Sequence, residues 1–493
     1  MTLRALLQAM GAPRFAGDEG VEVHGLASDS RRVRPGDLFF ALAGLRQDGQ
    51  AFVRQALASG AVAAVVDHEA PAADGLLVRV PEPRRALAEA ATAFHGQPAR
   101  ALRVVGITGT NGKTTTTYLL EAVFRAAGWR PGVLGTTGAR RDGVTRPLGY
   151  TTPEATELQA LLREMADAGV QAVALELSSH ALVQRRGYGL DLDVAVFTNL
   201  SHDHLDYHGT LEAYLDAKLM LFDGRNASRP VKSATAVVNA DDPVAERVVA
   251  AARRGGMKVL RFGTTAGTDV RIARVETAPD GLVAELVTGV VTEVRLPLLG
   301  RYNAWNAAGA FAAALALGVA PARAAAGLAA VERVPGRLER IVTGRPFEVV
   351  VDYAHTPDAL QRSLAAMREH ARGRVLVVFG CGGERDRAKR PVMGHAARAG
   401  ADEVWVTSDN PRGEDPAAIA DEILAGAGGA GGPVHLELDR RAAIALALAA
   451  ARPGDAVLIA GKGHETTQIL GEQVLPFDDR EVARGLLREG GRG

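Results

Sequence analysis

The feature that most constrains the fold is a short apolar run, a Gly/Thr-rich loop and a helical pattern in direct succession, RVVGITGTNGKTTTTYLL at 103–120. The run 103–108 is typical of a buried strand, and apolar residues recur at helical spacing after the loop. In such a unit the loop N–H groups and the helix N-terminus bind phosphate, while a lysine reaches the outer phosphates and a threonine hydroxyl ligates Mg²⁺. Lys113 and Thr114 occupy those two positions, although Ile107 stands where the strict loop pattern has glycine. The unit predicts an α/β protein with a mononucleotide-binding parallel or mixed sheet.

Further near-continuous apolar runs predict more strands that are buried on both faces. In the middle of the chain they lie at 171–177, 193–200 and 235–242. Beyond Pro335 and Gly336, which interrupt an Ala-rich helical region, four more lie at 347–355, 374–386, 402–412 and 455–465. These four end in charged or Gly-rich loops. Because ligands of open α/β sheets gather at the carboxyl ends of strands, the four loops are candidate binding segments.

Composition limits the class of protein. A chain of 493 residues is too long for one core, so roughly two to four domains are expected. Lys+Arg and Asp+Glu both number 57, and this zero net charge argues against nucleic acid as the main partner. The one cysteine, Cys381, excludes an intrachain disulfide and favours a reducing, cytoplasmic compartment. The apolar segment 304–331 contains Pro321 and Arg323, which favours a buried helix pair over a membrane span.

Two charged side chains near the phosphate loop allow contrasting interpretations. Glu176 ends the strand at 171–177 beside two serines and a histidine, and it is either a Mg²⁺ ligand or part of a solvated loop. Lys218 lies in a helical pattern on the same face as Tyr214 and Phe222. From the residues alone it is interpreted as a surface lysine whose stem packs on these apolar neighbours.

The segment NLSHDHLDYHG at 199–209 contains His202, His204 and His208 together with Asp203 and Asp206. A zinc site is conceivable, but the oxygen-rich surroundings and the phosphate loop favour magnesium with a substrate phosphate. The alternative is a helix N-terminus with exposed histidines.

The order of these motifs along the chain resembles that of the Mur ligases, ATP-dependent amide-bond-forming enzymes of cell-wall precursor synthesis. The motifs are GITGTNGKTTT, ELSSH, TNLSHDHLDYH, Lys218, RYNAWN, GRLE, DYAHTP, GCGGERD, DNPR and GKGHE, between about residues 25 and 480. The resemblance is closest to the branch of the family that adds 2,6-diaminopimelate as the third peptide residue. It implies an N-terminal UDP-binding domain at 1–98, a central ATP-binding domain at 99–334 and a C-terminal Rossmann-like, amino-acid-binding domain at 335–493.

The resemblance also implies roles for individual residues. Catalysis would involve Lys113, Lys218, His208 and Glu176, and Mg²⁺ would be held by Thr114, Glu176, His208 and a carbamylated Lys218. ATP would contact Gly109, Thr110, Asn111, Gly112, Lys113, Thr114, Thr115, Asn303, Asn306, Arg337, Asp352 and His355. The UDP group would contact Ser30, Leu45, Arg46 and Gln47, although another member of the family has His-Gln-Ala where this chain has Leu-Arg-Gln. The muramyl-peptide would contact Thr151, Thr152, Ser178, Gln184 and Arg186. Diaminopimelate would contact Arg385, Asp409, Asn410, Pro411, Arg412, Gly461 and Glu465.

The implied reaction explains why a ligase needs a phosphate loop. A carboxylate is inert to amines, so ATP would first convert the D-glutamate γ-carboxylate of UDP-N-acetylmuramoyl-L-alanyl-D-glutamate into an acyl phosphate, which the amine of meso-diaminopimelate would attack. Phosphoryl transfer of this kind needs positioning and charge neutralisation rather than a protein nucleophile. The expected partners are these small molecules, with no nucleic acid and no membrane span, and the expected state is a cytoplasmic monomer. The same ligation with L-lysine, a folylpolyglutamate synthase-like ligase and a P-loop switch or motor subunit are the alternatives.

Overall fold

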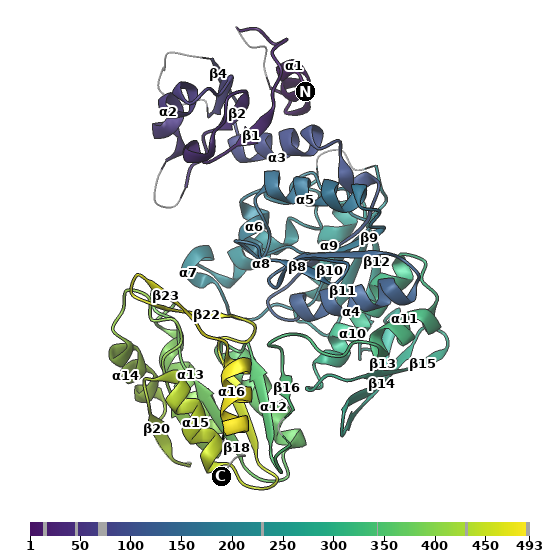
Figure 1. Ribbon diagram of the computed structural model, residues 1–493. Helices are drawn as coiled ribbons and strands as arrows, with labels where there is room; N and C mark the ends of the chain where they lie inside the picture. The colour runs from purple at the N-terminus through teal and green to yellow at the C-terminus, as the bar shows by residue number, and fades with distance from the viewer. Residues whose placement is uncertain are drawn as a thin grey trace.

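The computed structural model describes residues 1–12, 17–44, 48–67, 76–227, 231–342, 344–428 and 432–489. Its strands form three main sheets in three successive regions of the chain, together with a separate two-stranded hairpin (Figure 1). Leu45, Arg46 and Gln47, which were expected to contact UDP, lie outside the described residues. The predicted α/β class is confirmed.

The N-terminal region is built on a four-stranded parallel sheet. In spatial order its strands are β1 (Gly25–Ala27), β2 (Asp37–Phe40), β3 (Ala63–Val66) and β4 (Leu77–Arg79). Its helices are α1 (Leu3–Ala9), α2 (Val53–Ala58) and α3 (Pro83–Phe94). Helix α3 packs against α5 (Ala155–Asp167) of the next region, and the N-terminal core continues onto Ala155 and Tyr188, so this region is joined to the central one by buried contacts (Figure 1).

The central region contains an eleven-stranded sheet that is parallel in its middle and antiparallel at both edges. In spatial order its strands are β15 (Val291–Leu296), β14 (Gly281–Val287), β13 (Val270–Ala278), β12 (Lys258–Gly263), β11 (Thr235–Asn239), β10 (Val194–Phe197), β5 (Arg103–Thr108), β9 (Ala172–Glu176), β6 (Pro131–Gly135), β7 (Gly138–Arg141) and β8 (Val144–Arg146). The strands predicted near 171–177, 193–200 and 235–242 are β9, β10 and β11. Each is shorter than predicted: β9 and β11 end on a polar residue, Glu176 and Asn239, and β10 ends just before Thr198.

Helices cover both faces of the central sheet. One core contains α4 (Lys113–Ala126), α10 (Asn303–Ala316) and α11 (Pro321–Ala329), and the other contains α5, α8 (Leu211–Leu219) and α9 (Ala245–Arg254). Helices α10 and α11 confirm the helix pair predicted in 304–331. At Gly327 a Cβ would lie 2.5 Å from the Cα of Val123, so only glycine lets α11 pack this closely on α4. Within the described ranges, no helix has the length and apolar character needed to cross a bilayer.

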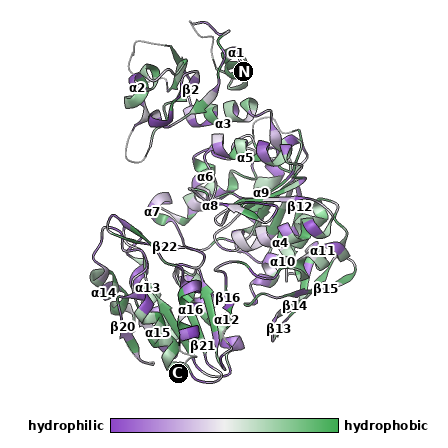
Figure 2. Ribbon diagram, in the orientation of Figure 1, coloured by the Kyte–Doolittle hydropathy of each residue, from purple (hydrophilic) through white to green (hydrophobic). Residues whose placement is uncertain are grey.

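The C-terminal region has a six-stranded sheet in the order β16 (Glu339–Ile341), β17 (Glu348–Asp352), β21 (Ala456–Ala460), β18 (Val375–Phe379), β19 (Glu403–Val406) and β20 (Val434–Leu436). All neighbours except β16 and β17 are parallel, and the central strands are strongly apolar (Figure 2). Helices α12 (Pro357–His370), α13 (Lys389–Gly400) and α14 (Pro416–Gly426) pack in one core, and α15 (Arg440–Ala450) and α16 (Asp479–Glu489) in the other. The hairpin of β22 (Thr467–Leu470) and β23 (Gln473–Pro476) follows β21.

A buried ion pair fixes α15 and α16 to the strand ends of this sheet. The Arg440 guanidinium donates to both carboxylate oxygens of Asp479, at 2.8 and 2.7 Å, and both side chains are fully buried. It also donates to the carbonyls of Ser408 and Ala460, which follow β19 and end β21. The pair therefore holds two of the loops that the sequence analysis singled out.

Replacing Asp479 with alanine is expected to lower the free energy of unfolding of this region by about 3–5 kcal/mol, because Arg440 would remain as an uncompensated buried charge. Hydrogen exchange of the β19 and β21 amides as a function of urea would measure the loss. The matched control is Glu489→Ala, which breaks the exposed Arg441–Glu489 pair between the same two helices and should cost less than about 1 kcal/mol. If both substitutions lowered the free energy of unfolding equally, burial would not explain the contribution of the Arg440–Asp479 pair.

Candidate active site between the central and C-terminal regions

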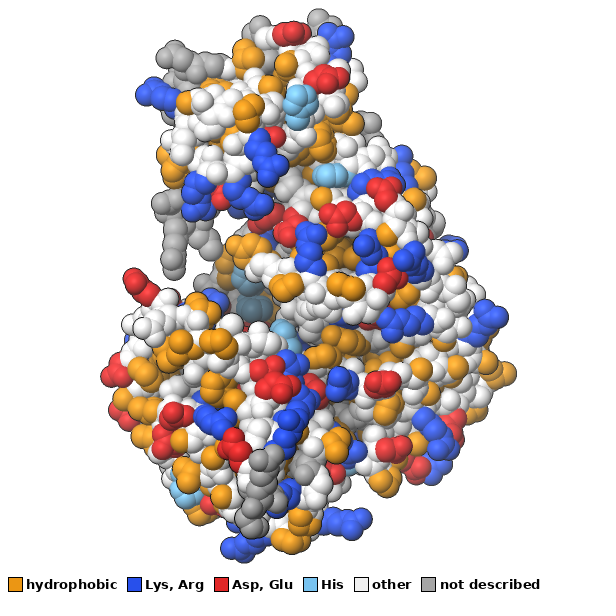
Figure 3. Space-filling view, viewed as in Figure 1, with side chains coloured by type: hydrophobic (Ala, Val, Ile, Leu, Met, Phe, Trp, Pro, Cys, Tyr) orange, Lys and Arg blue, Asp and Glu red, His pale blue; other side chains and the backbone are white. Residues whose placement is uncertain are grey.

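A cavity of about 550 Å³ lies where the phosphate loop of the central region meets the C-terminal region. Its central wall comes from the loop after β5, the carboxyl ends of β9, β10 and β11, and the start of α10. Its C-terminal wall comes from Arg337, the segment after β17 and the first turns of α12. On the face shown in Figure 3 the surface is hollowed where these two parts meet, and histidine side chains are visible there.

The phosphate loop needs glycine at two positions. Gly109 has φ +144°, and a Cβ there would lie 1.9 Å from the Thr198 hydroxyl. Gly112 has φ +87°, and its Cβ would lie 2.3 Å from the Asn306 amide oxygen. Both the backbone conformation and the close neighbours exclude larger residues. Lys113 begins α4 and folds back, so that its ammonium donates to the carbonyls of Gly109 and Thr110 at 2.8 and 2.7 Å.

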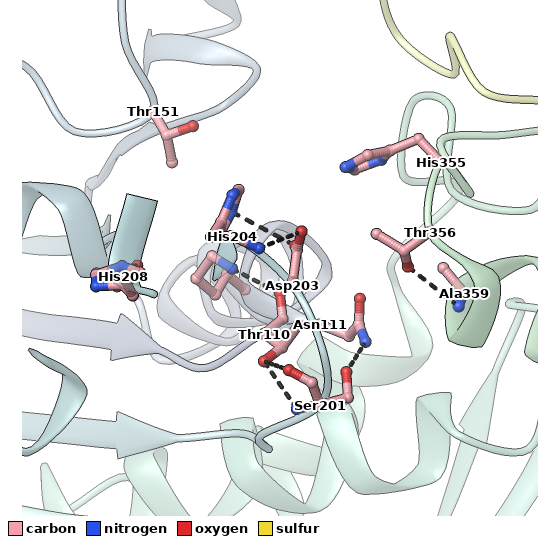
Figure 4. Close-up of polar contacts among 12 residues, drawn as sticks. Thr110, Asn111, Thr151, Ser201, Asp203, His204, His208, His355, Thr356 and Ala359 are labelled. Atoms are coloured by element: carbon pink, nitrogen blue, oxygen red, sulfur yellow. Dashed lines mark hydrogen bonds and ion pairs between the residues drawn. The ribbon is translucent and has the colours of Figure 1, made fainter. Parts of the chain in front are cut away.

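Side chains of the loop connect it to the rest of the cavity. Figure 4 shows Thr110 and Asn111 hydrogen-bonded to Ser201, with His208 and His355 on opposite sides of them. Asn111 also donates to the Asp358 carboxylate of α12, at 3.2 Å, and Arg337 donates to the Thr114 hydroxyl at 3.3 Å. These two contacts join the phosphate loop directly to the C-terminal region.

Glu176 lies at the end of β9 and is fully buried, so its interpretation as part of a solvated loop is wrong. Its Oε2 accepts hydrogen bonds from the hydroxyls of Thr114 and Thr136, at 3.2 and 3.0 Å. Its Oε1 accepts a hydrogen bond from the Thr136 backbone N–H. The carboxylate is therefore held beside the first residues of α4, on the phosphate side of the cavity.

Lys218 is also buried, with only 1% of the residue exposed, so its interpretation as a surface lysine is wrong. Helix α8 turns this residue toward the cavity, and its ammonium lies 4.1 Å from the centre of the Tyr214 ring. Burial lowers the pKa of Lys218 well below its usual range, the nearby Lys113 lowers it further, and Asp203 opposes the shift. The neutral amine is therefore far more populated here than at the surface.

The histidines of 199–209 occupy different positions. His208, in α7 (Leu205–His208), contacts the Ser179 hydroxyl at 2.9 Å, and burial followed by the charges of His180 and Lys218 lowers its pKa to about 4. His202 and His204 are both exposed, and His204 lines the cavity beside Asp203. Across the described part of the chain, no group of three or more His, Cys, Asp or Glu side chains could hold a metal ion. The structure thus gives no support to a zinc site in this segment.

The residues expected around the nucleoside also line this cavity. The amide of Asn306 donates to that of Asn303 at 2.7 Å, at the start of α10. Asp352, which ends β17, accepts hydrogen bonds from the Leu338 N–H and the Ser363 hydroxyl, at 2.6 and 3.0 Å. The Arg337 guanidinium packs over the Tyr353 ring at 4.5 Å. Asn303, Asn306, Arg337, Asp352 and His355 all contribute to the wall of this one cavity.

Several wall residues were missed by the sequence reasoning. Asn239 ends β11 and Asp241 follows it, and the Asp241 carboxylate accepts a hydrogen bond from the Trp305 indole at 2.7 Å. Phe262, from β12, lies in the same wall. The rule that ligands gather at the carboxyl ends of parallel strands could have identified Asn239 and Asp241, because they close the run 235–242.

The residues expected to hold the muramyl-peptide are connected by hydrogen bonds. The Thr152 hydroxyl donates to the Glu176 carbonyl and accepts from the Ser178 N–H. Arg186 donates to the Thr152 carbonyl at 3.0 Å and to the Gln184 amide oxygen at 2.6 Å. Thr151 and Ser178 reach the cavity wall itself. Ser30 lies apart from this group in the N-terminal region, where its hydroxyl contacts the side chain of Gln55.

The DNPR and GKGHE loops lie beyond the cavity wall, at the carboxyl ends of β19 and β21. Arg412 has φ +53°, a left-handed conformation that is rare for a residue with a side chain. Its N–H donates to the Ile469 carbonyl, and its guanidinium donates through Nη1 to the Gly383 carbonyl at 2.8 Å. Gly461 has φ +115° and packs against Asp409, where a Cβ would lie 2.5 Å from the carboxylate. Arg385, in the neighbouring loop, is exposed, and Pro411 is buried.

Three family models match successive parts of the chain. They are described as the Mur ligase family catalytic domain, over residues 22–95, the Mur ligase middle domain, over 107–314, and the Mur ligase glutamate ligase domain, over 336–463. The protein belongs to the Mur ligase family, whose members are ATP-dependent ligases that form amide bonds.

Individual relatives carry a more specific name. A UDP-N-acetylmuramoyl-L-alanyl-D-glutamate–2,6-diaminopimelate ligase from Geobacillus thermodenitrificans is 45% identical over 472 residues, which cover 95% of each chain. The ligase of the same name from Geobacter sulfurreducens is 44% identical over the whole of both chains. A solved structure of a ligase of this name has a TM-score of 0.72 and 35% identity, covering 100% of this chain and 99% of that one. Mycobacterium tuberculosis folylpolyglutamate synthase, at 23% identity over 76% of this chain and 91% of its own, shares the fold with a TM-score of 0.63.

Proposed function

We propose that this protein joins meso-2,6-diaminopimelate to the D-glutamate γ-carboxylate of UDP-N-acetylmuramoyl-L-alanyl-D-glutamate, with conversion of ATP to ADP and phosphate. The observation that carries the proposal is the single cavity in which Lys113, Glu176 and Lys218 meet the nucleoside-side residues Asn306 and Asp352. Whole-length similarity to ligases of that name supports it. The protein would act as a cytoplasmic monomer on these small molecules, without a nucleic-acid partner.

The reaction would proceed in two steps, which the chain's own residues would assist. In the first, a γ-carboxylate oxygen attacks the terminal phosphorus of ATP and the bond to ADP breaks. In the second, the amine nitrogen attacks the acyl carbon and loses a proton, and the bond to phosphate breaks. The Lys113 ammonium, which donates to the carbonyls of Gly109 and Thr110, would donate to phosphate oxygens instead. Its positive charge would offset the negative charge on the phosphoryl group during transfer. Thr151 and Ser178 would hold the acceptor peptide across the cavity from the loop.

The site also fits Mg²⁺. The Thr114 hydroxyl and the Glu176 carboxylate are hard oxygen ligands that already contact each other beside the phosphate loop, and His208 contacts the hydroxyl of Ser179, which lines the same cavity. Bound Mg²⁺ would supply positive charge against the phosphate oxygens.

We propose further that Lys218 is carbamylated. The neutral Nζ would attack CO₂, form an N–C bond and release one proton. The side chain would then end in a carboxylate instead of an amine. An unperturbed lysine is neutral in about one molecule in a thousand at neutral pH. The burial that lowers the pKa of Lys218 raises that fraction, and the charge of Lys113, which disfavours a second cation, would favour an anion there.

An ADP-release assay tests the proposed function. Release should require both the UDP-muramyl-dipeptide and 2,6-diaminopimelate, and a panel of amino acids should show that L-lysine is a poor substitute. Equal use of L-lysine would favour the lysine-adding alternative. ADP release that needs neither substrate would favour a switch or motor subunit, and turnover with a folate acceptor would favour the folylpolyglutamate synthase-like alternative.

Arg412→Ala is expected to raise the KM for diaminopimelate at least about tenfold, with little effect on the KM for ATP. Diaminopimelate differs from lysine by a distal carboxylate, and a guanidinium can bind a carboxylate with two parallel hydrogen bonds. Among the described residues, the guanidinium of Arg412 donates only through Nη1, to the Gly383 and Asn410 carbonyls, so Nε and Nη2 can serve that purpose. Loss of a charged hydrogen bond costs about 1.5–3 kcal/mol, or roughly ten- to over a hundredfold in affinity.

The control for this variant is Arg387→Ala, which removes an exposed arginine of a neighbouring loop that pairs with Glu422. Its KM for diaminopimelate should stay unchanged. If Arg412→Ala leaves discrimination between diaminopimelate and lysine unchanged, the assignment of this loop is wrong.

A further inference from the structure

One fully buried cation in the C-terminal region has no part in the function described so far. Lys462 follows Gly461 after β21, and its side chain is 0% exposed. Its ammonium donates to the Asn410 amide oxygen at 3.1 Å and to Glu465 Oε2 at 3.0 Å. It therefore bridges the loop after β19 and the loop after β21, which are the two loops proposed to bind the incoming amino acid.

The contacts of Lys462 fix which way the Asn410 amide faces. Its oxygen accepts from the Lys462 ammonium and from the Ile469 backbone N–H, at 3.1 and 3.0 Å. Both of these groups can only donate, so the oxygen must face them and the NH₂ group must point the other way. One NH₂ hydrogen is used by Glu465 Oε2, at 2.9 Å, and within the described residues the other is left for a ligand acceptor.

The Glu465 carboxylate is oriented by the same contacts. Among the described residues, its side-chain hydrogen bonds with Lys462 and Asn410 both end on Oε2, which leaves Oε1 for an ammonium group. The Glu465 side chain is 32% exposed, whereas Lys462 is enclosed. Lys462 is thus placed behind the two side chains that can reach a ligand.

We propose that Lys462 is a positioning residue for amino-acid selection: it locks Asn410 and Glu465 into one rigid unit that presents an N–H donor and a carboxylate oxygen to one amino-acid centre of the substrate. This inference rests on the proposed function. A site that distinguishes diaminopimelate from lysine needs donors and acceptors at fixed spacing, because discrimination is lost when the recognising groups can move. Lys462 supplies that rigidity without touching the substrate.

The test compares Lys462→Met with wild type in the ADP-release assay. Methionine fills the same buried volume without donors, so the KM for diaminopimelate should rise by about tenfold or more and the preference over L-lysine should fall, with the KM for ATP unchanged. Lys462→Gln, which keeps one donor for Asn410, should restore part of the selectivity and provides a second variant if methionine impairs folding. In a double-mutant cycle, Lys462→Met should add little to the KM change already caused by Asn410→Ala.

The matched control is Arg374→Met. Arg374 forms ion pairs with Asp455 and Glu403 at the opposite end of the same sheet, so its loss should lower Tm and leave the KM for diaminopimelate unchanged. The inference is overturned if Lys462→Met and Lys462→Gln keep wild-type KM and selectivity. It is also overturned if they change the KM values for ATP and diaminopimelate equally, or if their KM effects add fully to those of Asn410→Ala. The proposed function fails separately, if wild type does not turn over diaminopimelate at all.

Discussion

Replacing Lys113 with alanine is expected to slow ADP release by at least about a hundredfold to a thousandfold, the range found when one charge-stabilising donor is removed from an active site. The physical reason is that the ammonium lies over the phosphate loop, where it offsets charge on the phosphoryl group in transfer. The fold should be retained, because within the described residues this side chain donates its hydrogen bonds to carbonyls of its own loop, those of Gly109 and Thr110. Single-turnover measurement of ADP release, together with Tm, would test both parts of this expectation.

Lys232→Ala is the control for this variant. Lys232 also donates to backbone carbonyls, those of Ala99 and Leu102, and pairs with Asp193 in the central region, but it lies outside the cavity. Its loss should lower Tm and leave turnover nearly unchanged. Near-normal turnover in Lys113→Ala would remove the loop lysine from the mechanism.

Lys218→Ala is expected to be nearly inactive, with a loss of about a hundredfold or more if the residue supplies a carboxylate that helps to neutralise the phosphoryl group. Short carboxylic acids such as formate and acetate should restore part of the activity, because alanine leaves room in the cavity for their carboxylate. A wild-type sample prepared without CO₂ should also lose activity and regain it when bicarbonate is added.

The control for this rescue is Lys113→Ala, which lacks a cation rather than an anion and should not respond to the same acids. Mass spectrometry of the intact wild-type protein should detect the added CO₂, and Lys218→Ala should lack it. A folded Lys218→Ala protein with full activity would show that the carbamate hypothesis is wrong.

The sequence predicted the parallel strands well, because residues buried on both faces of a sheet must be apolar and the runs that became β9, β10 and β11 have little else. It predicted the phosphate loop for a similar reason, since Gly109 and Gly112 adopt conformations that other residues avoid. Motif order then suggested the family, which the family models confirm.

Burial of single charged residues was harder to predict. The apolar neighbours of Lys218 are compatible with a lysine stem lying on the surface or with a lysine inside a cavity, and only the packing of α8 decides between them. The Arg440–Asp479 pair joins residues 39 positions apart, and Lys462 meets Asn410 across 52. No local pattern marks such partners, because each depends on how the strands are ordered in the sheet.

Two contacts join the phosphate loop to the C-terminal region, Asn111 with Asp358 and Arg337 with Thr114. Rotation of the C-terminal region away from the loop would break both contacts. The shape of the nucleotide site and the position of the amino-acid site therefore depend on the same equilibrium, between two orientations of the C-terminal region. Any ligand that prefers one orientation shifts the affinity for the other ligand, and linkage makes the effect reciprocal. The factor by which ATP changes the affinity for the incoming amino acid must therefore equal the factor by which that amino acid changes the affinity for ATP.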